Sequence, residues 1–133
     1  MSHDGVEARG LSFTYPDGTP ALDGVSFRLR HGESAAVVGA NGAGKSTLLL
    51  ALNGLVTPAS GEAWIGEVPV TPATRARIHR SVGYVFQDAD DQLFMPTVRE
   101  DVAFGPLNLG LTPAEVEARV RTALATVGAE HLS

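Results

Sequence analysis

The stretch from Gly39 to Ser46 constrains the fold of this 133-residue chain more than any other feature. It matches the pattern G-x-x-x-x-G-K-[ST]. The residues before it, Ala35 to Val38, are wholly apolar, as in a short strand that is buried on both faces. The residues after it, Lys45 to Leu55, are apolar over most of a helical circumference. The pattern therefore predicts a core strand, a glycine-rich loop and a buried helix in direct succession.

A loop of this kind is suited to holding the phosphates of a nucleotide. Small residues let backbone N–H groups surround phosphate oxygens, and the following helix directs its positive end toward them. Lys45, the chain's single lysine, is expected to reach the β- and γ-phosphates. The Ser46 hydroxyl is the expected magnesium ligand, and Thr47 can bond a phosphate. The predicted phosphate-binding residues are Gly39, Ala40, Asn41, Gly42, Ala43, Gly44, Lys45, Ser46 and Thr47.

Composition argues against several other kinds of protein. There is no cysteine, which excludes a disulfide framework, a thiolate zinc site and a cysteine nucleophile. The net charge of −5 is unlike that of a nucleic-acid-binding chain, and no nucleic-acid partner is expected. The longest apolar run, Leu48 to Leu52, is far short of the ~20 residues of a membrane span. The sequence therefore predicts a soluble, cytoplasmic chain.

The rest of the chain alternates between strand-like and helix-like patterns. Val6 to Tyr15 and Val25 to Arg30 alternate as half-buried antiparallel strands do. Glu62 to Val70 reads as a short hairpin, and Thr71 to Arg80 as an arginine-rich helix or loop. Val82 to Phe86 is a second apolar run that predicts a core strand. These patterns together predict an α/β fold.

A final helix is predicted by its capping residues. Thr112 is a suitable N-cap, Pro113 suits the first helical position, and Glu115 completes a capping box. Gly128 is expected to end the helix. Its predicted apolar face consists of Val116, Val120, Ala123, Leu124 and Val127.

Several stretches resemble the ATP-binding subunits of ABC transporters. Leu11 to Gly18 and Ala21 to Phe27 are similar to the opening of such a subunit, and Leu55 to Gly61 to the segment after its first helix. Val82 to Gln87 is similar to its Q-loop strand. The resemblance runs from about Val6 to the end of the chain. It implies a P-loop NTPase core of the ABC ATPase type, preceded by an antiparallel β-subdomain.

Two further stretches narrow the resemblance. Phe86 to Phe94 and Pro96 to Gly110 are similar to the ATPase subunits of cobalt/nickel and energy-coupling-factor (ECF) vitamin importers. This resemblance implies ATP and Mg²⁺ as cofactors, and hydrolysis that drives uptake of cobalt/nickel or a vitamin. It also implies a second ATPase subunit, identical or different, and a peripheral position on the inner face of the cell membrane.

The resemblance also assigns roles to individual residues. Tyr15 would stack on the adenine ring. Gln87 would contact magnesium and the attacking water, and would join Lys45 in the catalytic set. A transmembrane subunit would be contacted near Asp88, Asp90, Asp91, Gln92, Leu93 and Phe94.

Some elements of an ABC ATPase do not occur in the sequence. It has no Leu-Ser-Gly-Gly-Gln signature, no apolar run ending in Asp-Glu (the Walker B motif) and no switch-loop histidine. In the family these follow a helix like Ala114 to Val127. Residues 1–133 are therefore interpreted as a partial nucleotide-binding domain, truncated inside its helical subdomain. Such a piece is expected to bind ATP without hydrolysing it.

Three alternatives remain open at this point. The chain could come from an ABC ATPase unrelated to importers. It could be a P-loop small-molecule kinase, whose arginine-rich lid would have to come from Arg75 to Arg80. It could also be a binding module without catalytic activity.

Overall fold

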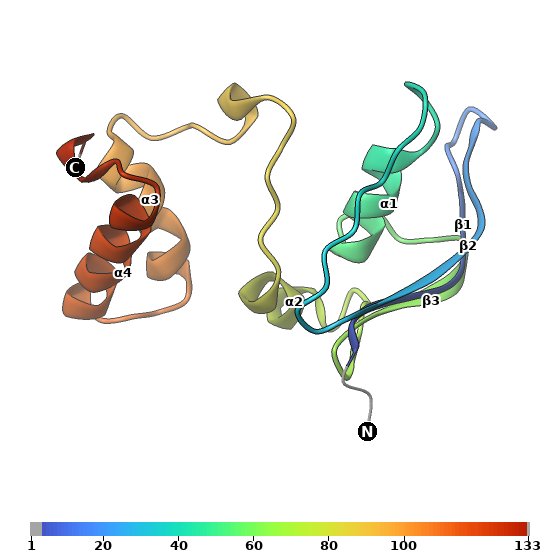
Figure 1. Ribbon diagram of the computed structural model, residues 1–133, viewed down its shortest axis with the longest axis horizontal. Helices are drawn as coiled ribbons and strands as arrows, with labels where there is room; N and C mark the ends of the chain where they lie inside the picture. The colour runs from blue at the N-terminus through green and yellow to red at the C-terminus, as the bar shows by residue number, and fades with distance from the viewer. Residues whose placement is uncertain (1–3, 133) are drawn as a thin grey trace. The chain divides into compact units, whose positions relative to one another are not determined.

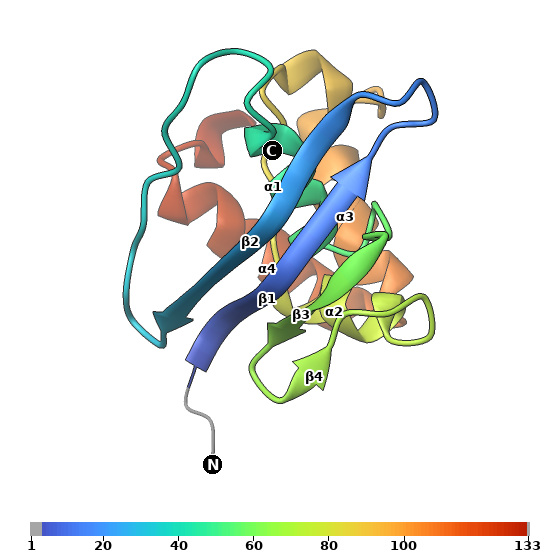
Figure 2. The ribbon, with the colours of Figure 1, turned by 90° about the vertical axis from the view of Figure 1, so that its right-hand side faces the viewer.

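The computed structural model describes residues 4–132, which form two compact units, one up to Tyr84 and one from Val85 onward. The first unit contains a four-stranded sheet (Figures 1 and 2). Its strands are β1 (Asp4–Thr14), β2 (Pro20–Arg30), β3 (Ser60–Ile65) and β4 (Val68–Pro69), in the order β2-β1-β3-β4. All neighbouring pairs are antiparallel. The predicted antiparallel strands and short hairpin are therefore confirmed.

The core of the first unit lies where helix α1 (Lys45–Leu52) packs against the sheet (Figure 2). Leu11 of β1 is fully buried there. It shares the covered face with Ala8, three residues earlier, because an irregularity in the strand register between them interrupts the strict alternation. The helix is less enclosed than its apolar sequence predicts, since Leu49 remains 43% exposed. The buried core residues are Ala8, Leu11, Leu22, Leu48, Ala51 and Ala63.

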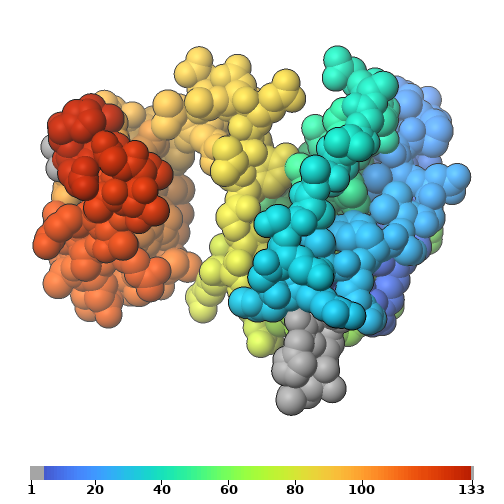
Figure 3. Space-filling model, viewed as in Figure 1, coloured from blue at the N-terminus to red at the C-terminus, as the bar shows by residue number. Residues whose placement is uncertain are grey.

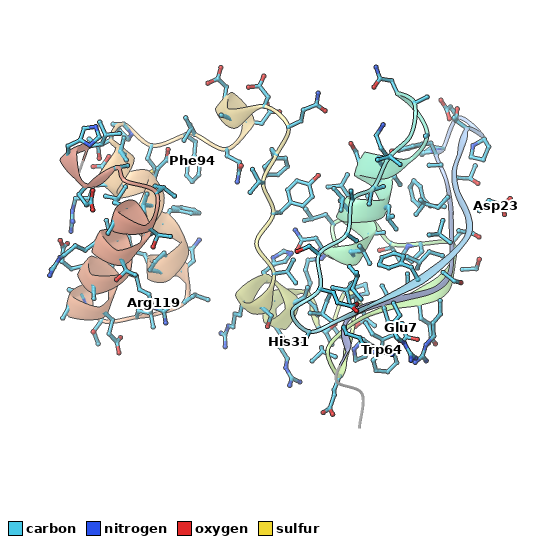
Figure 4. The ribbon with its side chains drawn as sticks, viewed as in Figure 1. Glu7, Asp23, His31, Trp64, Phe94 and Arg119 are labelled. Carbon is cyan, nitrogen blue, oxygen red and sulfur yellow. The ribbon has the colours of Figure 1, made fainter. Side chains whose placement is uncertain are left out.

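Charged residues gather on β1 and its neighbours. Glu7 lies opposite Trp64 in the pairing of β1 with β3, and the two lie close together in Figure 4. Arg9 donates to Glu7 (2.7 Å) and lies over the Trp64 ring (5.5 Å). The Arg9 hydrogen bond, helped by Arg28, lowers the pKa of the Glu7 carboxyl. These contacts tie β2 and β3 to β1.

Two predicted core strands are not strands in the structure. Residues 35–38 and 82–86 have irregular backbone, and Val38 and Val85 are each 87% exposed. Both segments have the apolar composition of parallel core strands. A strand, however, exists only where a neighbour supplies ladder hydrogen bonds. Within residues 4–132 no segment pairs with either of them. The prediction of two core strands is therefore wrong for this chain as described.

Helix α2 (Arg75–Ser81) lies in the predicted arginine-rich region. Ile78 is buried, at 1% exposed. The Arg75 Nε donates to the Gly54 carbonyl (2.9 Å), and the His79 ring contacts the Asn53 carbonyl (3.1 Å). Arg75 thus holds α2 against the end of α1. This contact gives Arg75 a structural role in place of the lid role that a kinase would need.

The second unit is a pair of packed helices, α3 (Val98–Asn108) and α4 (Pro113–Thr126), flanked by short 3₁₀ turns η1 (Ala89–Asp91) and η2 (Glu130–Leu132). The capping box of Thr112 and Glu115 is present as predicted. The buried residues are Ala103, Val116, Val120 and Leu124. The apolar face of α4 is narrower than predicted, because Val127 is 75% exposed. Arg99 of α3 forms an ion pair with Glu117 of α4.

Candidate functional site

The glycine-rich loop connects an extended segment to the N-terminus of α1. Residues 31–43 lie on the outside of the first unit (Figure 3). The loop turns by a hydrogen bond from the Ala43 amide to the Ala40 carbonyl (3.1 Å). Gly44 is the N-cap of α1 and has a φ of 95°, in the left-handed region. A Cβ atom at Gly44 would collide with the Ala21 carbonyl oxygen of β2, so the loop approaches the sheet only because residue 44 is glycine.

The N-terminus of α1 is free of competing side chains. Gly44 supplies no side-chain cap, and the first turn contains no acidic residue. The first amide groups of a helix have no carbonyl acceptor within the helix, and the helix dipole makes this end positive. This end of α1 therefore has the donors and the polarity that an anionic ligand requires.

Lys45 adds a positive charge to the same loop. Its Nζ donates to the carbonyl oxygens of Gly39 and Ala40, the latter at 3.1 Å. The ammonium is thus held at the start of the loop, where a phosphate group could replace the two carbonyls as its acceptor. The nearby residues Ala21, Leu22 and Val38 line an open pocket that also reaches Lys45.

Tyr15 meets the first turn of α1. Its hydroxyl lies 2.6 Å from the Thr47 hydroxyl oxygen, within hydrogen-bond distance. Its ring packs edge-on against Phe13, with 5.1 Å between ring centres, and remains 41% exposed. A turn fixes its backbone, since the Tyr15 amide donates to the Thr19 carbonyl (2.8 Å). The structure thus brings together the predicted base-stacking residue and the predicted phosphate loop.

The turn after Tyr15 is held by a carboxylate. Asp17 accepts from the Thr19 amide (2.9 Å), and this bond lowers the pKa of the Asp17 carboxyl. Residues 15–19 therefore form a defined turn that carries the exposed Tyr15 ring.

The remaining predicted residues belong to the second unit. Gln87 is exposed and precedes η1. The Asp88 side chain accepts from the Asp90 amide (3.1 Å), and the Gln92 side chain accepts from the Phe86 amide (3.0 Å). Leu93 and Phe94 are each 61% exposed. The acidic and amide side chains thus shape this segment, and two apolar side chains project from it.

The family model for the ABC transporter matches residues 22–133, most of the chain. The chain belongs to the ABC transporter family. This membership decides against the P-loop kinase alternative. It also confirms the resemblance on which the fold class was predicted, an α/β ABC ATPase with an N-terminal antiparallel sheet.

Individual relatives show which ABC transporter proteins this chain is similar to. The energy-coupling factor transporter ATP-binding protein EcfA of Methanothermobacter thermautotrophicus is 58% identical over 92% of this chain and 40% of its own length. The protein of the same name from Methanocaldococcus jannaschii is 51% identical over 94% of this chain and 46% of its own length. The chain spans about half the length of the curated relatives it matches. The predicted likeness to ECF ATPases is therefore confirmed.

A solved structure is also similar to this ABC transporter chain. It is cbiO1 of Clostridium perfringens, part of the ABC transporter complex cbiONQ. The TM-score is 0.84 at 38% identity, over 98% of this chain and 53% of cbiO1. Among the helices of residues 4–132, none is long and apolar enough to cross a membrane.

Asp101, on helix α3, was missed by the sequence analysis. Its carboxylate accepts from the amides of Phe94 (3.4 Å) and Met95 (3.2 Å), and so holds the segment before α3. The Thr97 side chain caps this helix by accepting from the Glu100 amide (3.1 Å). The sequence does contain a signal for the start of α3, because Thr97-x-x-Glu100 has the spacing of a capping box.

Proposed function

We propose that this chain binds ATP, with the triphosphate held by residues 39–47 and the adenine stacked on Tyr15. The observation that carries the proposal is the uncapped N-terminus of α1 beside the Lys45 ammonium, in a loop with the full phosphate-binding pattern. The contact between Tyr15 and Thr47 supports it, because an exposed aromatic ring then lies next to the same turn of helix.

Phosphate binding would exchange weak acceptors for strong ones. The amides of Lys45, Ser46 and Thr47 are the first three of α1 and have no acceptor within the helix. The Lys45 ammonium now donates to neutral carbonyls of Gly39 and Ala40. Hydrogen bonds between a cation and an anionic oxygen are stronger than those to a neutral carbonyl. The loop therefore gains most from a ligand that carries several negative oxygens.

Ser46 fits a role as a magnesium ligand. Mg²⁺ prefers oxygen, keeps several waters and completes its shell with few protein groups and the phosphates of the substrate. Ser46 offers an exposed hydroxyl in the first turn of α1. Groups of three or more metal-binding side chains do not occur in residues 4–132. Bound there, the ion would supply charge neutralisation for the phosphates.

For the whole subunit we propose ATP hydrolysis coupled to uptake by an ECF-type importer, with cobalt/nickel or a vitamin as cargo. The identity to two EcfA proteins and to cbiO1 supports this. Gln87 would contact magnesium and orient the attacking water, and a second ATPase subunit would pair with this one. The subunit would sit peripherally on the inner face of the membrane. The 133 residues contain no Asp-Glu carboxylate after an apolar run, so they would bind ATP without turnover.

A surface of the second unit would receive the transmembrane subunit. We define this Phe94 surface by Leu93, Phe94 and Phe104, with the polar residues Asp88, Asp90, Asp91 and Gln92. Phe94 packs edge-on against Phe104, with 4.7 Å between ring centres, and both rings are exposed (Figure 4 labels Phe94). Exposed aromatic residues flanked by carboxylates suit a partner helix with an apolar face and basic edges.

Equilibrium titration with a fluorescent ATP analogue tests the nucleotide proposal. We expect saturable binding, one nucleotide per chain, that unlabelled ATP displaces. Tyr15→Ala should weaken binding about tenfold or more, because stacking on a base contributes ~1–3 kcal/mol. Leu55→Ala is the matched control, since Leu55 is similarly exposed (44%) in the same unit. An absence of binding, or equal weakening by both substitutions, would contradict the proposal.

A further inference from the structure

The Thr47 hydroxyl occupies a position between the two predicted halves of the nucleotide site. It is in the first turn of α1, where the residue is only 3% exposed. It lies 2.6 Å from the hydroxyl of Tyr15, which is 32 residues earlier in the chain. A hydroxyl has one hydrogen to donate and two lone pairs that accept. Thr47 can therefore donate to one partner and accept from another at the same time.

We propose that Tyr15 and Thr47 form a hydrogen-bond chain that couples base stacking to phosphate binding. In this chain the Tyr15 hydroxyl donates to Thr47, and Thr47 donates to a phosphate oxygen. Thr47 is thus a positioning residue for the Tyr15 ring, in addition to its predicted contact with phosphate. The inference rests on the proposed binding of ATP. It adds a mechanism by which phosphate binding and base stacking strengthen each other.

A bound anion fixes which hydroxyl donates in the Tyr15–Thr47 hydrogen bond. Without a ligand, either hydroxyl can be the donor of the Tyr15–Thr47 hydrogen bond. A phosphate oxygen can only accept, so the Thr47 hydrogen turns toward it, and Tyr15 becomes the donor to Thr47. Consecutive hydrogen bonds of this kind polarise and strengthen each other. Phosphate binding would therefore tighten the contact that holds the Tyr15 ring.

The Tyr15 ring is held in three ways. Its edge packs against Phe13, its hydroxyl contacts Thr47, and its backbone is part of the turn closed by Thr19. The remaining exposed surface of the ring is available for a base. A ring that is already oriented loses less conformational entropy when a ligand stacks on it. The hydroxyl contact is the one of the three that responds to phosphate.

Five variants separate this hydrogen-bond chain from simple stacking, and one of them combines Tyr15→Phe with Thr47→Ser. Tyr15→Phe keeps the ring and removes the hydroxyl. Thr47→Val keeps the shape of residue 47 and removes its hydroxyl, and Thr47→Ser restores a hydroxyl. Tyr15→Phe combined with Thr47→Val completes a double-mutant cycle. Dissociation constants of Mg-ATP and of Mg-tripolyphosphate, which has no base, are measured for each variant of the full chain.

We expect Tyr15→Phe to weaken ATP binding about 3- to 10-fold, because the ring loses its hydroxyl contact and must then be ordered when the base stacks on it. The hydrogen bond itself is present without ligand, so only this ordering and its strengthening by phosphate affect the affinity. Tripolyphosphate binding should weaken less than ATP binding, by about twofold or less, because without a base only the strengthening of the Thr47–phosphate hydrogen bond is lost. In the Thr47→Val background, Tyr15→Phe should have no further effect on ATP, and Thr47→Ser should restore the sensitivity. Should Thr47→Val fail to fold, Thr47→Ala, which also lacks the hydroxyl, takes its place in the double-mutant cycle.

Other outcomes would overturn the inference. Wild-type affinity in Tyr15→Phe, or effects that simply multiply in the double variant, would show that the hydroxyls act independently. If Tyr15→Ala weakens ATP binding and Tyr15→Phe does not, Tyr15 acts by stacking alone and the proposed hydrogen-bond chain is refuted. If the wild-type chain binds no ATP, the proposed function falls together with this inference.

Discussion

The carbonyl oxygen of Ala21 lies far closer than 3.0 Å to the point where a Cβ atom of Gly44 would stand. Strand β2 and the glycine-rich loop are therefore in contact through backbone atoms. Gly44 also has a positive φ, so a side chain there would be both strained and in collision. Gly42 has a positive φ as well, but a Cβ atom added there would stand in open space.

Gly44→Ala should consequently abolish tight nucleotide binding and lower the free energy of unfolding by more than Gly42→Ala does. Gly42→Ala carries only the backbone strain, about 1–2 kcal/mol. Urea unfolding and nucleotide titration of both variants measure the difference. Equal stability of the two variants would show that the collision with Ala21 is relieved without cost.

Lys45→Arg should lose most of the nucleotide affinity although the charge is kept. The compact ammonium fits between the Gly39 and Ala40 carbonyls, whereas a guanidinium is larger and planar. Arg77→Lys, an exposed exchange of the same two residue types on α2, should leave affinity unchanged. Fluorescent-ATP titration compares the two. Retention of wild-type affinity in Lys45→Arg would refute the role of Lys45.

Acid should loosen the α3–α4 pair through Glu117. The hydrogen bond from Arg99 lowers the pKa of this carboxyl below its ordinary 4.5, and Glu117 raises the pKa of Arg99 in turn. A lowered carboxyl pKa stabilises the folded state fully above pH 4.5, and this stabilisation is lost as the pH falls through the lowered value.

Hydrogen exchange of α4 amides, compared between wild type and Glu117→Gln at the same pH, measures this effect. Wild type should be better protected than Glu117→Gln at pH 6, and the difference should shrink below pH 4.5. Arg121 is a weaker partner, at 4.0 Å from Glu117, so Arg121→Gln should change protection less than Arg99→Gln. A difference independent of pH would argue against the ion pair.

Phe94→Ala should weaken association with the transmembrane subunit about tenfold or more, as loss of an aromatic anchor at an interface does. Val127→Ala removes another exposed apolar side chain, at the C-cap of α4, and should have no such effect. Co-purification of the whole ATPase subunit with its membrane partner in detergent measures both. Equal retention of the partner by the two variants would place the interface elsewhere.

Local signals in the sequence predicted the elements that depend on local chemistry. Thr112, Pro113 and Glu115 define the start of α4, and alternation defines β1 and β2. The segments 35–38 and 82–86 were mispredicted because apolar composition does not reveal whether a pairing partner is present. Helix α3 was missed although Thr97 and Glu100 have capping spacing.

The sequence predicts which residues form the candidate site but not the contacts between them. The loop motif predicts residues 39–47 as the phosphate site because that spacing is itself what phosphate binding requires. The Tyr15–Thr47 hydrogen bond joins residues that are 32 positions apart, and no local pattern encodes such a contact. The approach of Gly44 to Ala21 likewise depends on how α1 packs on the sheet.

The most direct test of the account is an NMR titration of the full chain, which follows backbone amides and the Tyr15 ring as Mg-ATP and then Mg-tripolyphosphate are added. We predict that both ligands shift the amides of residues 39–47. Only ATP should change the Tyr15 ring signals strongly, because only ATP has a base to stack. Unchanged loop amides at saturating ATP, or shifts confined to other parts of the chain, would contradict the assignment of residues 39–47 as the triphosphate site.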